Sequence, residues 1–166
     1  AGSLFDPEYA VGGHQPYYYD QLSALYQHYI VHKSKINVTA TGYGILAAPT
    51  ASTSTLVLRG DDTATGLTTT KTTLMELPGS KFVKFPAWNT GNSVTRQLTM
   101  SYDKNKIFKN FKNSDLQAQV GTNPAEDWYF IVSGWTDSGP TAQNIWLDVI
   151  IDYDVEFFEA KDPPGS

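Results

Sequence analysis

Four lysines and two phenylalanines share one short stretch of this chain. Between residues 104 and 112, four of the chain's twelve positive charges fall close together, with aromatic rings between them. Ammonium groups bind phosphates, and aromatic rings stack on bases in proteins that bind single strands. A solvated turn whose rings pack on the protein body would have the same composition. We predict a nucleic-acid contact, made by Lys104, Lys106, Phe108, Lys109, Phe111 and Lys112.

Other residues with catalytic or metal-binding chemistry are less well placed. His28 and His32 have the i, i+4 spacing of a helical zinc pair, but on a strand their rings would lie roughly 13 Å apart. The acidic residues near the C-terminus alternate along a line instead of converging on one point. The chain has no cysteine, no Gly-x-Ser-x-Gly elbow and no glycine-rich phosphate loop. We therefore predict no metal, no cofactor and no enzymatic activity.

The composition indicates strands as the elements that position these residues. The chain has 166 residues, enough for one domain, with 13% aromatic and only 17% charged residues. Such a mixture favours pleated, half-buried surfaces. One short helix is predicted over residues 20–26, where Leu22, Leu25 and Tyr26 follow the helical period and Asp20 stands as N-cap.

Alternating apolar residues predict two long strands. The first begins near Tyr29, and its parity switches near Lys33 and Ser34, which indicates a bulge. The last covers residues 145–157 and would span roughly 40 Å, with one face in the core and the other mostly carboxylate. Shorter strands are predicted over 55–59 and 94–102, and a central strand covered on both faces over 128–132. The long loops between them favour Greek-key crossovers in a sandwich.

Residues 14–36 carry a more specific pattern. The run His14-Gln15-Pro16-Tyr17-Tyr18-Tyr19-Asp20-Gln21-Leu22 and the later Ser34-Lys35-Ile36 resemble the start of the capsid proteins of circovirus-like, circular Rep-encoding single-stranded DNA viruses (CRESS DNA viruses). The turn at Leu77-Pro78-Gly79 and the closing strand at 151–157 are also similar to that family.

This resemblance implies an all-β fold, an eight-stranded antiparallel jelly-roll β-sandwich with one short helix before the first strand. Residues 1–16 would form an extended N-terminal arm, 17–160 the jelly-roll shell domain and 161–166 a C-terminal tail. About sixty copies would self-assemble into an icosahedral T=1 shell, the virion, around a circular single-stranded DNA genome. Assembly would take place in the host nucleus, with no membrane partner and a host receptor that the sequence does not identify.

One departure from the family concerns the genome contact. The family binds DNA mainly through an arginine-rich N-terminal arm, whereas this sequence has two arginines in all. That arm is absent from these residues: it is disordered and left out, it has been removed, or the protein packages DNA by other means. Within these residues, the basic stretch at 104–112 is the candidate for the inner surface of a shell.

Two other classes of protein stay open. A carbohydrate-binding β-sandwich module would use Trp88 and Trp135 as a stacking platform. An enzyme on a cupin-type jelly roll would need two or three histidines and a carboxylate converging on a metal, and the histidines here cluster on one segment.

Overall fold

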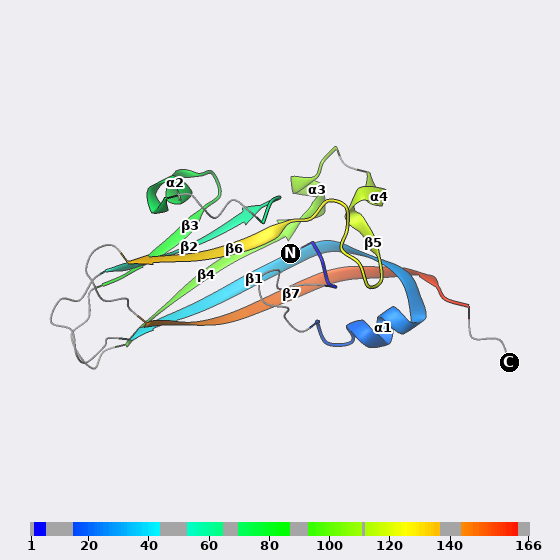
Figure 1. The fold of residues 1–166 in the computed structure, drawn as a ribbon, viewed down its shortest axis with the longest axis horizontal. Helices are drawn as coiled ribbons and strands as arrows, with labels where there is room; N and C mark the ends of the chain where they lie inside the picture. The colour runs from blue at the N-terminus through cyan, green and yellow to red at the C-terminus, as the bar shows by residue number, and fades with distance from the viewer. Residues whose placement is uncertain are drawn as a thin grey trace.

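Strands dominate the structure, a computed structural model, and form two antiparallel sheets (Figure 1). It describes residues 2–5, 15–43, 53–64, 70–86, 93–110, 112–136 and 144–162. The predicted all-β class is confirmed, with seven strands in the described residues where eight were expected. In chain order the elements are α1 (Tyr19–Leu25), β1 (Tyr26–Tyr43), β2 (Ser54–Asp61), α2 (Lys71–Glu76), β3 (Lys81–Phe85), β4 (Ser93–Asp103), α3 (Lys104–Ile107), α4 (Asn113–Leu116), β5 (Gln117–Gln119), β6 (Tyr129–Thr136) and β7 (Asn144–Ala160).

The first sheet is built on the long pair of β1 and β7. The two strands are antiparallel from Tyr26 opposite Ala160 to Tyr43 opposite Asn144, with a register shift between Val31 and Lys33. The predicted bulge is therefore present, next to the parity switch that indicated it. The other side of β1 pairs with β4 and, nearer its start, with β5. Among the described residues, β7 has β1 as its one strand partner, so β7 forms an edge of this sheet.

The second sheet has the order β3-β2-β6. Its middle strand is covered on both faces, because Thr55 and Val57 are as deeply buried as Leu56 and Leu58 on the opposite face. The prediction that residues 128–132 form the central strand is wrong in the described sheet, since β6 pairs with β2 on one side only. An apolar run at both parities does not distinguish a central strand from an edge strand whose faces are covered by other elements.

The core lies between the two sheets. Alternate residues of β1 (Ile36, Val38, Ala40) and Leu98 of the neighbouring β4 pack with Leu56 and Leu58 of β2 and Phe85 of β3 in the second sheet. A second cluster fills the end of the molecule where α1, α3 and β5 lie, and it is rich in aromatic side chains. Burial of these side chains is the main favourable term for the fold.

Helix α1 confirms the predicted helix before the first strand, but its start differs. Tyr18 occupies the N-cap position with a left-handed backbone and no side-chain cap, and Asp20 lies inside the first turn. At that position the Asp20 carboxylate interacts favourably with the positive end of the helix dipole. Tyr19 is the buried residue, while Leu25 is 60% exposed. Three further short helices, α2, α3 and α4, were not predicted, since helices of four to six residues carry too little periodicity to detect.

Part of the predicted N-terminal arm is anchored on the domain. The Gly2 amide donates to the Trp128 carbonyl at 3.1 Å, and Leu4 is 3% exposed in the aromatic-rich cluster. The Ser3 hydroxyl lies 3.3 Å from the Tyr29 hydroxyl. After β7, the Lys161 ammonium group donates to the Ser23 carbonyl at 2.6 Å, which ties the start of the predicted tail to α1.

Candidate functional site

The basic stretch at 104–112 lies at one end of the first sheet, where the chain passes from β4 to β5 (Figure 1). Asp103 ends β4 and caps α3, because its carboxylate accepts a hydrogen bond from the Asn105 amide at 3.1 Å. The cap stops the strand and starts a single helical turn. This turn divides the basic residues into an inward set and an outward set.

Lys104 and Phe108 form the inward set. Both are 7% exposed, and the Phe108 ring packs edge-on against Tyr102 and Trp128 with centroids 6.3 Å apart. The Lys104 ammonium group donates to the side-chain oxygen of Asn113 at 3.4 Å. Neither side chain is accessible to a polyanion in this fold. The Phe108 ring packs on the protein body, as in the alternative interpretation of this stretch as a solvated turn. It is therefore unavailable for base stacking.

Lys106, Lys109 and Lys112 form the outward set, which we call the lysine triad. All three are exposed, and the Lys106 ammonium group is 3.9 Å from the Asp103 carboxylate. Phe111, the other predicted stacking ring, lies outside the described residues. The described part of the stretch therefore offers exposed cations to phosphates without an aromatic platform beside them.

Asp127, a half-buried acid, lies near aromatic side chains of the second core cluster. Asp127 accepts a hydrogen bond from the Trp128 amide at 2.7 Å. Burial raises the pKa of Asp127 above 3.8, against the lowering effect of the hydrogen bonds from Trp128 and Gly2. Burial, together with the charge of Asp127, also raises the pKa values of the Tyr102 and Tyr153 hydroxyls. Both tyrosines keep their protons at neutral pH, so their hydroxyls are uncharged polar groups of the core.

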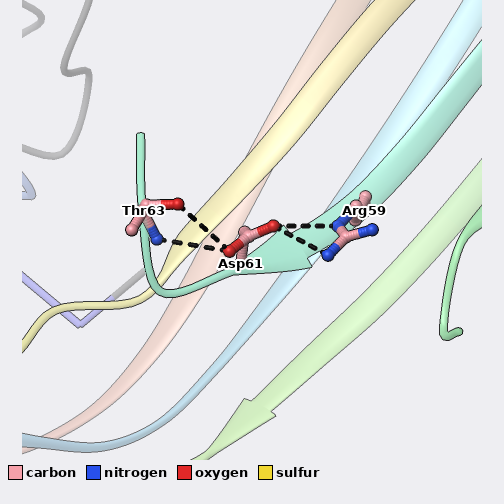
Figure 2. A network of polar contacts seen from close by, with 3 residues as sticks. All are labelled: Arg59, Asp61 and Thr63. Atoms are coloured by element: carbon pink, nitrogen blue, oxygen red, sulfur yellow. Dashed lines mark hydrogen bonds and ion pairs between the residues drawn. The ribbon is translucent and has the colours of Figure 1, made fainter. Parts of the chain in front are cut away.

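A second polar network lies at the end of β2. The guanidinium of Arg59 contacts one oxygen of Asp61 through Nε at 3.0 Å and Nη2 at 2.8 Å (Figure 2). The Thr63 amide and hydroxyl donate to the other oxygen at 3.3 Å. Burial alone raises the pKa of Asp61, but hydrogen bonds to Asp62 and Thr63 and the charge of Arg59 together lower it below 3.8. The network holds the turn after β2 in place, and the charge of the Asp61 carboxylate is balanced by the guanidinium of Arg59.

The acidic face of β7 is matched by basic residues on β1. In register, Asp152 lies opposite Lys35 and Asp154 opposite Lys33, and the His32 ring is 2.8 Å from the Glu156 carboxylate. Opposite charges across a strand pair stabilise the pairing. The residues that the structure describes hold no group of three or more histidine or acidic side chains that could bind a metal ion.

The first half of β7 shows a feature that sequence reasoning missed. Four of its apolar side chains are exposed, namely Trp146 (69%), Leu147 (43%), Val149 (47%) and Ile150 (63%). We call these four residues the β7 apolar edge. Leu147 and Val149 point to the core side of the sheet, yet Ala40 and Val38 opposite them are only 1% exposed. The cover over the first sheet thus ends between β1 and β7, which corrects the expectation that this whole face of β7 is core.

The sequence did contain a signal for the two outer residues of the β7 apolar edge. Trp146 and Ile150 interrupt the carboxylate face of the predicted strand with large apolar side chains.

The predicted sugar-stacking pair is not assembled in the described residues. Trp135 is half-buried on β6, and Trp88 lies outside the described residues. In the described part of the chain, no helix is long and apolar enough to cross a membrane.

Comparisons with models of protein families, with curated proteins and with solved structures find no match to this chain.

Proposed function

We propose that this chain is a viral capsid protein that self-assembles into a small icosahedral shell, T=1 with about sixty subunits, around a circular single-stranded DNA genome. The observation that carries the proposal is the β7 apolar edge, four large apolar side chains exposed on both faces of one edge strand. Patches of this kind mark surfaces that are covered by a partner. The resemblance of residues 14–36 to circovirus-like capsid proteins supplies the identity of that partner, namely further copies of the chain.

The strand pairing supports a jelly-roll arrangement within this proposal. β1 pairs with β7, the last strand, and β2 pairs with β6, the strand before it. Such nested pairing of first with last is the pattern that a jelly roll has at its outer strands. After β2 and β3 in the second sheet, the chain returns with β4 to pair with β1 in the first sheet, a crossover between sheets of the kind found in β-sandwiches.

The DNA contact of this chain is proposed to be the lysine triad. Its three residues are exposed, and the adjacent turn is anchored by Phe108 in the core. The family's basic arm would supply the rest of the binding. In this proposal, the protein is found in the virion, and assembly takes place in the host nucleus.

Particle size at neutral pH tests the assembly proposal directly. Gel filtration with light scattering and negative-stain imaging should show shells of about 1.1 MDa and on the order of 20 nm across. A protein that stays monomeric at high concentration, in the presence and absence of single-stranded DNA, would contradict the proposal. A change in tryptophan fluorescence of such a monomer on adding glycans would favour the carbohydrate-binding alternative.

Salt-dependent binding tests the lysine triad separately. Changing Lys106, Lys109 and Lys112 together to glutamine should reduce the slope of log K against log salt for single-stranded DNA by about 2, since each phosphate contact contributes about 0.7. Lys33 and Lys35 provide a matched control pair, because they are also exposed cations but lie opposite carboxylates of β7. An unchanged slope in the triad variant would remove the triad from the proposal.

A further inference from the structure

We propose that the free edge of β7 pairs with the β7 of a second copy, antiparallel and with Val149 on the two-fold axis, so that the first sheets of two copies form one continuous sheet. This inference rests on the proposed self-assembly and assigns it a particular contact. Figure 1 shows β7 along the border of its sheet, with β1 between it and β4.

The backbone is the first argument for a strand as the occupant. Along its length β7 is paired with β1 on one side, and the described residues provide no strand for its other side. An edge strand presents a row of unpaired amide and carbonyl groups that another strand can satisfy. Natural edges are usually protected by short length, bulges, proline or charged side chains, and between Asn144 and Ile151 the strand carries one charge, Asp148. This strand runs from Asn144 to Ala160 without proline, and the register shift of the pair falls at its distant half, opposite Val31 and Lys33.

The side chains are the second argument. The β7 apolar edge has residues on both faces of the strand, Leu147 and Val149 on the core side and Trp146 and Ile150 on the outer side. A partner that covered one face only would leave the other pair exposed. A strand added at the edge covers both, because its own side chains alternate between the same two faces.

The charges along β7 indicate a second copy in one register. Two antiparallel copies keep their core faces on one side only if residues of the same parity are opposite each other. A two-fold axis at Asp148 would place this carboxylate opposite the Asp148 carboxylate of the second copy. An axis at Ile150 would place Asp148 opposite Asp152 of the second copy. Axes at residues 151–155 likewise place two carboxylates opposite each other. Like charges directly opposite are destabilising.

An axis at Val149 avoids every such pair over the longest described stretch, from Asn144 to Asp154. It places Leu147 opposite Ile151 on the core side, and on the outer side Trp146 opposite Asp152 and Asp148 opposite Ile150. Each exposed apolar side chain then gains a cross-strand neighbour. An axis at Leu147 also avoids like charges but pairs only residues 144–150 within the described strand.

A cysteine introduced at the axis tests the register, because the chain has no cysteine of its own. In Val149→Cys the two thiols face each other, with Cβ atoms about 4.5–5.5 Å apart, close to what a disulfide needs. Leu147→Cys is the matched control on the same strand and face with similar exposure, and its two thiols lie roughly 13 Å apart along the strand. Under mild oxidation, the dimer band of Val149→Cys on a non-reducing gel should exceed that of Leu147→Cys about tenfold or more.

Equal linking of the two single variants overturns the inference, and so does the absence of a link in both Val149→Cys and the double variant Leu147→Cys with Ile151→Cys. The double variant Leu147→Cys with Ile151→Cys guards against a local distortion at Val149, because its two thiols face each other in the same register and should also give a dimer. Light scattering on the unmodified chain separates the two proposals. Shells that form while neither Val149→Cys nor the double variant links refute this edge and leave the capsid function standing. Linked dimers without larger particles support the edge and refute the shell.

Discussion

Individual residues of the basic stretch show how one sequence motif serves two purposes. Phe108 and Lys104 anchor the turn after β4 in the core, while Lys106, Lys109 and Lys112 face solvent. Alternation of inward and outward residues over one helical turn is what any capped surface turn produces. The turn is therefore a scaffold first, and its outward cations are available for binding because its inward ring holds it in place.

Replacing the anchor should affect stability, whereas replacing an outward cation should affect DNA binding. Phe108→Ala should lower the free energy of unfolding by about 3–5 kcal/mol, because a buried ring packed on Tyr102 and Trp128 is lost. Lys109→Ala should change it by less than about 0.5 kcal/mol, as expected for an exposed side chain, while weakening single-stranded DNA binding. Urea unfolding and a DNA titration measure the two effects, and equal destabilisation by both variants would contradict the division into inward and outward residues.

The half-buried acid Asp127 gives a residue-scale prediction on pH. Because burial raises its pKa above 3.8 in the folded protein, the folded chain holds the proton more tightly than the unfolded chain. Its contribution to stability is therefore full at low pH and is lost as pH rises from about 3.8 through the raised pKa. Each unit of the shift corresponds to about 1.4 kcal/mol.

Asp127→Asn tests this sign without removing the acceptor for the Trp128 amide. The difference in free energy of unfolding between the variant and the natural chain should grow in favour of the variant as pH rises from about 4 to 7 and then level off. Urea unfolding at a series of pH values measures it, and the other carboxylates cancel in the difference. A difference that does not change with pH would show that Asp127 titrates alike in both states.

At the scale of elements, the segment before α1 contributes to the core as the strands do. Residues 2–5 contribute Leu4 to the aromatic-rich cluster, and the Gly2 amide reaches the chain just before β6. Where the predicted arm is described, at residues 2–5, it is docked on the domain. It links the start of the chain to Trp128, the residue against which Phe108 packs.

Leu4→Ala should therefore lower the free energy of unfolding by about 2–5 kcal/mol, as for a buried leucine in a core. Phe5→Ala, next to it but 37% exposed, is the control and should have a clearly smaller effect. Thermal or urea unfolding of both variants measures the difference. Equal and small effects would mean that the segment contributes little to the domain.

At the scale of the whole molecule, the main feature is a sandwich with an open edge. The core is closed over β1 but not over the first half of β7, so the fold leaves apolar area that only a further chain covers in our proposal. A charge introduced within that edge should change assembly without changing the fold.

Ile150 offers such a test because it is 63% exposed and lies opposite Asp148 of the second copy in the proposed register. Ile150→Asp should reduce particle formation by at least about tenfold, since it places two carboxylates opposite each other. Ile150→Lys, equally polar and of opposite charge, should assemble better than Ile150→Asp. Light scattering at matched concentration measures both, and circular dichroism confirms that each variant is folded. Equal loss in both variants would indicate that only the apolar character of the position matters.

Strand content, the helix before β1, the bulge in β1 and the long closing strand all follow from the sequence. They depend on side-chain period and local propensity, which are properties of neighbouring residues. The three short helices and the edge position of β6 do not follow, because they are decided by caps and by which strands pair over long distances in the chain.

The candidate site divides in the same way. The sequence alone determined where the cations are, since their spacing within residues 104–112 is visible directly. Only the tertiary structure decided that Phe108 and Lys104 face inward, because a ring is buried or exposed by what packs on it and not by its neighbours in the chain. The same reason holds for the β7 apolar edge. Its alternation was visible in the sequence, but the extent of the second sheet, which no local pattern encodes, decided that Leu147 and Val149 stay exposed.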